Sequence, residues 1–221
     1  MIKFKKTSFD RKKYEEMQPG MTFSSHTDIS ENTFTEFQNI YENGTETDIH
    51  IFLEANPTYL YFALSHTGHH GFWSRSKPQI RPPLINGKKG HIPDFLLCGS
   101  SSNGTEWFAI ELKGPQAKLF NNKGTAFSPD ANEGIVQLVD YVDYINRNIS
   151  TIRTTLEIPN LNPVKGILLI GKHDETFEDE VKQELKAAFN RTMKGIDLVS
   201  YSRIYSWANE HFEFTKSKSG S

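Results

Sequence analysis

The sequence predicts an α/β domain with a mixed central sheet flanked by helices, and three observations lead to this prediction. Short apolar runs typical of strands alternate with longer segments whose apolar residues recur at helical spacing. Two of the apolar runs are separated by a Gly- and Ser-rich segment, which is typical of a β-hairpin. The 221 residues and the 12% aromatic content are sufficient for one sizeable core and exclude wholesale disorder.

Local patterns define the elements of the first half of the chain. Residues 1–43 carry several lysines and scattered aromatic residues without a sustained period, so they form an amino-terminal extension whose structure the sequence does not specify. A helix is expected from Glu46 to Asn56, because Pro57 ends it. The segment Thr58 to Leu64 is a candidate strand, since its bulky residues alternate between two faces.

A hairpin and a long helix follow. The hairpin joins the strands His91–Cys98 and Trp107–Lys113 through the loop Gly99–Thr105. The helix runs from Asp130 to Asn148, and the pair Asp130 and Glu133 resembles a capping box. Its predicted core stripe consists of Ile135, Leu138, Val139, Val142, Ile145 and Ile149.

The last third of the chain again alternates strands and helices. The continuous apolar run Val164–Ile170 is typical of a strand covered on both faces. A helix over Thr176–Arg191, a short strand over Ile196–Tyr201 and a helix over Arg203–Phe212 complete a domain that spans residues 44–214. Residues 215–221 are expected to form a disordered tail.

The hairpin carries acidic groups where a buried strand should have none. Because side chains alternate across a strand, Glu111 and Lys113 share one face, while Phe108, Ile110 and Leu112 form an apolar core face. If the hairpin turns symmetrically about Ser102 and Asn103, Asp94 lies directly across from Glu111, with Cβ atoms about 5 Å apart. Two carboxylates this close require a compensating cation.

Lys113 supplies one positive charge and a divalent metal would supply the rest. Mg²⁺ (or Mn²⁺) suits the pair Asp94 and Glu111, because Mg²⁺ prefers oxygen ligands and is commonly held by one or two carboxylates. The chemistry that follows is phosphodiester hydrolysis, in which Lys113 orients or deprotonates the attacking water or neutralises charge on the phosphorus. The alternative interpretation is an exposed hairpin that ends in a surface salt bridge.

The combination of Pro93-Asp94 with Glu111-Leu112-Lys113 resembles the PD-(D/E)xK nuclease superfamily and, more narrowly, the nuclease domain of Shedu-type anti-phage defence proteins. This resemblance implies a restriction-endonuclease-like fold and metal-dependent hydrolysis of DNA in phage defence. It also implies that the backbone carbonyl of Leu112 joins Asp94 and Glu111 as a metal ligand. Gly114 stands where an Arg is frequent in the family's motif, which puts one phosphate contact in doubt. The matching segments are Phe52–Pro57, Pro93–Leu97, Ile110–Pro115, Gln137–Tyr141 and Gly166–Gly171.

Two further features bear on the same site. Gln137 and Tyr141 are one helical turn apart, as in a Gln-x-x-x-Tyr element of several related nucleases, which implies that they orient the site or touch the substrate backbone. The alternative is that Tyr141 widens the core stripe and Gln137 is a surface residue. Glu46 is a candidate auxiliary metal ligand on the preceding helix, whereas Glu54 is interpreted as helix-surface charge.

The net charge of −2 hides an uneven distribution. Two windows without acidic residues, Ser74–Pro93 and Gly114–Pro129, flank the candidate site and have the composition of loops. Basic loops beside a metal site suit DNA as the partner, because neutralised phosphates release counterions. Ordinary solvated loops are the alternative. The lysines that we expect to contact phosphates are Lys88, Lys89, Lys118 and Lys123.

The histidines, the single cysteine and the lengths of the apolar runs limit the possible metal sites and the cellular location. The histidines His66, His69 and His70 lack the Cys or acidic partners of a zinc site and are interpreted as loop residues. The single cysteine excludes an intrachain disulfide and favours a cytoplasmic location, and no apolar run is long enough to span a membrane. We also expect a homo-oligomer. Two rival functions remain: a catalytically silent DNA-end binding module of the same fold, and a repair or junction-resolving nuclease.

Overall fold

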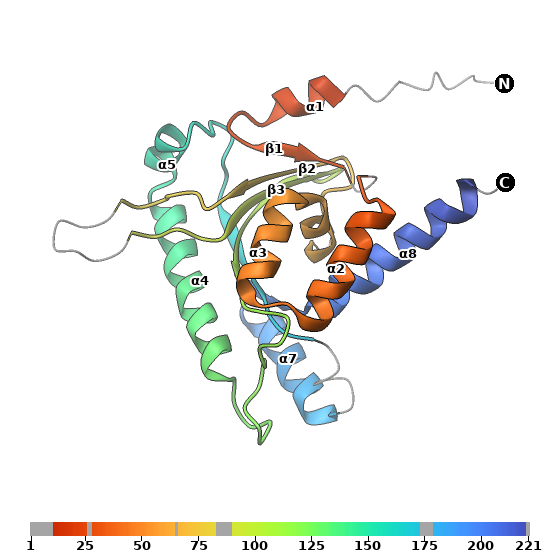
Figure 1. Ribbon diagram of the computed structural model, residues 1–221. Helices are drawn as coiled ribbons and strands as arrows, with labels where there is room; N and C mark the ends of the chain where they lie inside the picture. Colours follow the sequence, from red (N-terminus) through yellow and green to blue (C-terminus); the bar gives the residue numbers. More distant parts are fainter. Residues whose placement is uncertain (1–10, 26–27, 65, 83–89, 173–178, 220–221) are drawn as a thin grey trace.

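The computed structural model describes residues 11–25, 28–64, 66–82, 90–172 and 179–219 as one open mixed sheet with helices on both faces (Figure 1). The six strands lie in the order of the sequence. The first four pair antiparallel, and the last three pair parallel. The predicted mixed central sheet flanked by helices is therefore confirmed. The strands are β1 (Thr22–Ser24), β2 (Gly71–Ser76), β3 (Phe95–Ser101), β4 (Gly104–Leu112), β5 (Val164–Leu169) and β6 (Ile196–Val199).

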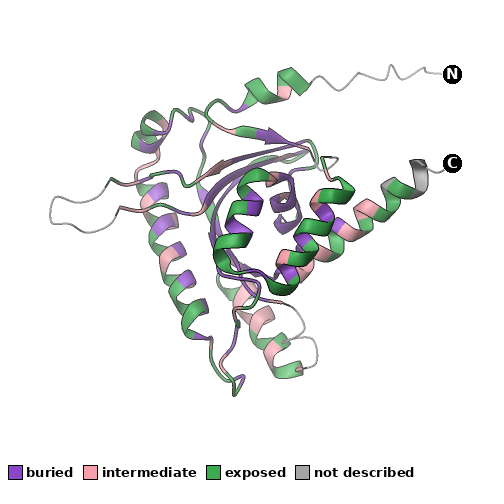
Figure 2. Cartoon of the chain, viewed as in Figure 1, coloured by how far each residue is buried: buried purple, intermediate pink, exposed green. Residues whose placement is uncertain are grey.

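Helices cover the two faces of the sheet and create two separate cores. One core gathers side chains from the helices within residues 31–63 and from the helix that begins at Tyr201, and the other gathers side chains from the helices within residues 129–155 and the chain around them. Figure 2 shows the sheet as the buried layer between these helices. Within the described residues, no helix is both long and apolar enough to cross a membrane. The helices are α1 (Arg11–Met17), α2 (Glu31–Asn43), α3 (Glu46–Ala55), the 3₁₀ helix η1 (Pro57–Ala63), α4 (Pro129–Arg147), α5 (Ile149–Thr155), α7 (Glu180–Thr192) and α8 (Tyr201–Ser219).

The β3–β4 hairpin has the predicted symmetry but a shorter loop. Phe95 pairs with Ile110 and Ser101 pairs with Gly104, so the turn is centred between Ser102 and Asn103. The predicted loop Gly99–Thr105 is wrong because both strands continue into it. Gly104 adopts a φ of 109°, a backbone conformation that permits the tight reversal.

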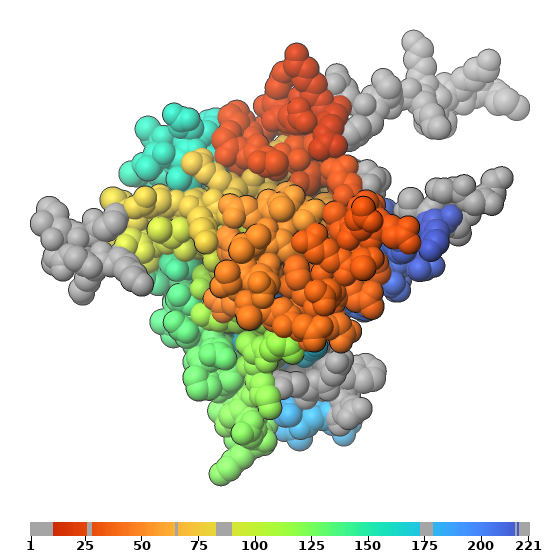
Figure 3. Space-filling model, in the orientation of Figure 1, coloured from red at the N-terminus to blue at the C-terminus, as the bar shows by residue number. Residues whose placement is uncertain are grey.

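The described residues between Arg11 and Asn43 contribute to the sheet and to one of the cores. Strand β1 pairs with β2 at the sheet edge, and α2 buries Phe34, Phe37 and Tyr41 in the core that it shares with α3 and α8. Figure 3 shows α2 and α3 side by side on the outer surface. These contacts join the described residues before Glu46 to the rest of the chain, and the predicted boundary between residues 43 and 44 stays a prediction.

Three predicted elements are wrong in kind or extent. The segment Thr58–Leu64 is not a strand but lies mostly within η1, because Pro57 at its start presets a helical φ and most of its side chains are buried. Helix α8 continues to Ser219, past the predicted start of a disordered tail at residue 215. The window that begins at Ser74 is part of β2 up to Ser76 rather than a loop. The predicted start of a helix at Thr176 lies outside the described residues.

Helix α4 begins one residue earlier than predicted and with a different cap. The Ser128 hydroxyl accepts a hydrogen bond from the Ala131 N–H at 3.0 Å, so Asp130 and Glu133 do not form the predicted capping box. Of the predicted core stripe, Leu138 and Ile145 are fully buried, whereas Val139 is 47% exposed. The buried face is centred on Gly134, Leu138, Tyr141 and Ile145.

We expect Gly171→Ala to destabilise the protein by roughly 1–3 kcal/mol, as measured by denaturant unfolding. Gly171 has a φ of 62°, and an added Cβ would collide with the backbone carbonyl of Ala117. Gly195→Ala is the matched control, because its Cβ would meet nothing within 4 Å. Equal stability of the two variants would contradict this explanation.

Candidate active site

The candidate site lies where β3 begins and β4 ends. Asp94 directly precedes β3, and the strand register brings it level with Glu111 near the end of β4. Its Oδ2 accepts a hydrogen bond from the Leu112 N–H at 2.8 Å, which fixes the carboxylate beside β4. Glu111 is only 6% exposed. The structure therefore brings together Asp94 and Glu111, the two carboxylates that were predicted from the sequence to lie opposite each other.

Lys113 connects the hairpin to α4. Its backbone N–H donates to the Leu169 carbonyl at 2.8 Å, which continues the pairing of β4 with β5. Its Nζ lies 3.3 Å from Glu133 Oε2 and 4.0 Å from Glu111 Oε1. Glu133 is therefore a residue of the site, although its sequence pattern predicted only a helix cap.

The carboxylates of this site are poorly compensated. Burial, and after it the neighbouring Asp94, raises the pKa of Glu111 to about 8, against the effect of Lys113. Burial also raises the pKa of Asp94, although the hydrogen bond from Leu112 opposes this. Partial burial raises the pKa of Glu46 as well, and Lys113 opposes that increase. The site thus holds more acidic groups than nearby cations can neutralise.

The carboxylate oxygens of Asp94 and Glu111 are of the chemical type that binds a divalent metal. Carboxylate oxygens are the ligands that Mg²⁺ prefers, and one or two of them suffice because the ion keeps several waters. In the described part of the chain, no group of three or more His, Cys, Asp or Glu residues is already arranged around a metal position. Asp94 and Glu111 would be the principal ligands, and the Leu112 carbonyl stays a predicted one.

Glu46 enters the site from the first turn of α3. A Cβ on Gly114 would lie 3.2 Å from the Glu46 backbone nitrogen, so the start of α3 lies against the chain just after Lys113. The exposed Glu46 side chain interacts electrostatically with Asp94 and Glu111, where an auxiliary ligand would be needed. Glu54 is exposed on the same helix, as predicted.

Two buried side chains near the site were not predicted from the sequence. His50, one turn after Glu46, is 7% exposed and places its Nε2 3.6 Å from Asp94 Oδ1. The spacing of four residues from Glu46 could have identified it. Tyr201, at the start of α8, is fully buried, and burial, then Asp94 and Glu46, raises its pKa. No local pattern in the sequence points to Tyr201.

Gln137 and Tyr141 lie on the same side of α4 as Glu133. Tyr141 is buried in the core, yet burial and then the nearby Glu111 raise its pKa, so it lies close to the site as well. Gln137 is partly buried, and its Oε1 has no hydrogen-bond partner within the described residues. Gln137 is therefore not simply a surface residue.

The predicted phosphate-binding lysines are only partly described. Lys118 and Lys123 are exposed between β4 and α4, whereas Lys88 and Lys89 lie outside the described residues. Two other basic residues of the first window are engaged within the protein. Arg81 Nη1 forms a hydrogen bond of 2.8 Å with His91 Nε2, and His91 Nδ1 lies 3.1 Å from Asp140 Oδ2 on α4.

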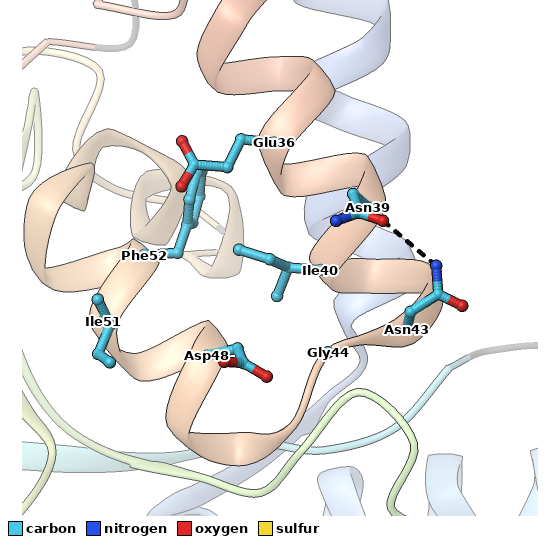
Figure 4. A pocket seen from close by; sticks show the side chains of 8 residues that line it. All are labelled: Glu36, Asn39, Ile40, Asn43, Gly44, Asp48, Ile51 and Phe52. Carbon is cyan, nitrogen blue, oxygen red and sulfur yellow. Dashed lines mark hydrogen bonds between the residues drawn. The ribbon is translucent and has the colours of Figure 1, made fainter.

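Two other features are separate from the site. The His70 N–H donates to the Ser100 carbonyl, which places His70 toward the opposite end of β3 from Asp94. A cavity of about 360 Å³ lies between α2 and α3, where Asn43 donates to Asn39 (Figure 4). None of the site carboxylates lines this cavity, and its Asp48 caps α3.

A family model described as Shedu protein SduA, C-terminal, matches residues 43–205. The chain belongs to this Shedu family. The match includes Glu46, Asp94, Glu111 and Tyr201, so it covers the whole candidate site. Among the curated proteins, none matches the chain. The predicted Shedu membership is confirmed, and it indicates a role in anti-phage defence.

The metal-free Shedu chain should lose stability as the pH rises from about 5 to 8. The pKa of Glu111 is about 8 in the folded protein against an ordinary value of 4.5, so the folded state holds this proton more tightly than the unfolded state does. Protonated Glu111 therefore adds to the free energy of unfolding, and this addition is lost as the pH rises toward 8 and the proton leaves. Unfolding in EDTA should show a loss of roughly 1–4 kcal/mol over this range. Glu111→Gln should remove most of the loss, and an unchanged pH dependence in that variant would contradict the assignment.

Proposed function

We propose that this Shedu chain is a divalent-metal-dependent nuclease that hydrolyses DNA phosphodiester bonds in anti-phage defence. The observation that carries the proposal is the meeting of Asp94, Glu111 and Lys113 at one end of the β3–β4 hairpin. This arrangement is similar to the core of the PD-(D/E)xK nucleases, in which two carboxylates and a lysine act together.

Each side chain has a distinct role in this proposal. Asp94 and Glu111, with the Leu112 carbonyl and Glu46 as auxiliary oxygens, would hold Mg²⁺ or Mn²⁺. When bound, the ion supplies a Lewis acid for the phosphoryl oxygen and a water of lowered pKa. Lys113 places its ammonium group between Glu111 and Glu133, where it can orient the attacking water or neutralise developing charge.

Substrate contacts extend outward from this centre. Tyr141 on α4 lies close to Glu111, and in this proposal Tyr141 and Gln137, one turn apart, orient the site or touch the DNA backbone. Lys118 and Lys123 are exposed on the segment that follows β4, and Lys88 and Lys89 belong to the other basic window. In this proposal, these lysines neutralise phosphates without reading the bases.

Asp94→Asn, Glu111→Gln and Lys113→Ala should each reduce DNA cleavage by roughly 100-fold or more while the protein stays folded. Each variant removes one charged group from the proposed centre. Cleavage of supercoiled and linear DNA with Mg²⁺ or Mn²⁺ measures the effect. In the metal-free protein, the thermal stability of the two carboxamide variants should hold or rise, because repulsion between the carboxylates is relieved.

The matched control for these variants is Glu106→Gln. Glu106 lies on the same strand but contacts Lys165 at 2.8 Å, away from the site, so its replacement should leave cleavage intact. Full activity in any of the three site variants would remove that residue from the mechanism. Cleavage that persists in EDTA would contradict metal dependence.

Replacing Lys88, Lys89, Lys118 and Lys123 together by Ala should weaken binding to all duplex sequences alike. The slope of log affinity against log salt should fall by about 0.9 for each phosphate that the variant no longer neutralises. Titration of labelled duplex at several salt concentrations measures this, with Lys165→Ala as a surface-lysine control. Cleavage at saturating DNA should survive. An unchanged slope and an unchanged affinity would show that neither basic window contacts the DNA phosphates.

A further inference from the structure

The Asp94 carboxylate is approached by a donor group on each of its two oxygens. Oδ2 accepts the Leu112 N–H at 2.8 Å, and this bond comes from the hairpin itself. Oδ1 faces His50 Nε2 at 3.6 Å, and this contact comes from α3, far away in the sequence. The orientation of Asp94 therefore depends on two elements that meet only in the folded protein.

His50 is held firmly in this position. Its ring stacks on Phe95 with centroids 5.2 Å apart and planes 25° apart, and the residue is 7% exposed. Phe95 follows Asp94 in the chain, so the stacking of His50 on Phe95 also holds α3 close to Asp94. A capping box between Thr45 and Asp48 fixes the start of α3, with the Thr45 N–H 2.8 Å from Asp48 Oδ2.

An ordinary core histidine would have its ring nitrogens hydrogen-bonded. Here Nε2 is buried and has no hydrogen-bond partner within the described residues, and it is directed at Asp94 Oδ1. The other nitrogen, Nδ1, lies 4.0 Å from the exposed carboxylate of Glu54. The separation of 3.6 Å is longer than a hydrogen bond, but such contacts in an empty catalytic site commonly shorten when the site is assembled.

We propose, on the basis of the nuclease function above, that His50 is a positioning residue for Asp94. Its Nε2–H donates to Oδ1 when the metal binds, and together with the Leu112 amide it fixes the plane of the carboxylate. The remaining lone pairs of Asp94 would then be available to hold a divalent metal. Partners of this kind, which hold a metal ligand from behind, typically change metal affinity or activity by about 10- to 100-fold when they are removed.

The test compares two replacements of His50 in the full chain. His50→Phe keeps an aromatic ring against Phe95 but removes the donor, whereas His50→Gln keeps an N–H donor near the position of Nε2. We expect His50→Phe to raise the Kd for Mn²⁺ by about 10-fold or more and to raise the Mg²⁺ concentration needed for half-maximal cleavage. His50→Gln should stay close to the wild type, and Glu54→Gln is the control for the other side of the ring.

Two reference measurements separate the possible failures. Wild-type protein that does not bind Mn²⁺ in calorimetry or by its electron paramagnetic resonance signal would overturn the proposed function, and the role of His50 with it. If the wild type binds and Asp94→Asn does not, unchanged Mn²⁺ affinity in His50→Phe overturns the role of His50 alone. Equal losses of affinity in both His50 variants, with unchanged melting temperatures, would also overturn it.

A direct measurement on the wild type covers the case in which a variant fails to fold. In protein labelled with ¹⁵N-histidine and saturated with Mg²⁺, the chemical shifts of the His50 ring should report a proton on Nε2. A ring that carries its proton only on Nδ1 could not donate to Asp94, and that result would exclude the proposed hydrogen bond.

Discussion

The pairing of β3 with β4 forces two carboxylates to face each other at the end of a buried sheet, and the other parts of the site respond to this constraint. The strands cannot shift by one residue, because each strand buries one set of side chains in each core. Asp94 and Glu111 therefore stay together even though like charges in this arrangement repel. The two cores supply the stability that holds them there.

The structure reduces this repulsion in three ways. The Leu112 amide stabilises charge on Asp94, and Lys113 does so for Glu111. Burial and Asp94 together favour the protonated form of Glu111, whose pKa is about 8. Lys113 lies closer to Glu133 than to Glu111, at 3.3 Å against 4.0 Å, so its single charge is divided between the hairpin and α4. A divalent cation would remove the remaining imbalance, which is the electrostatic reason for expecting one.

Local patterns in the sequence predict the parts of this arrangement that depend on local geometry. The register of the hairpin follows from the alternation of side chains and the turn at Ser102 and Asn103, and the helix α3 follows from its position before Pro57. Competition between neighbouring signals explains the errors nearby. Ser128, rather than Asp130, caps α4, and Pro57 starts a 3₁₀ helix where the alternation of side chains predicted a strand.

The roles of Glu133 and Tyr201 could not be predicted in this way, because each depends on how a distant element returns to the hairpin. The spacing of four residues places His50 on the same helix face as Glu46, but it does not predict the contact with Asp94. Gly114 shows how one such return is achieved. A side chain there would begin 3.2 Å from the Glu46 nitrogen, so glycine lets the first turn of α3 approach the chain that follows Lys113. That approach brings Glu46 to the carboxylates and, one turn later, His50 to Asp94. Gly114 is thus the point at which α3 joins the site, and a side chain there would require the start of α3 to give way.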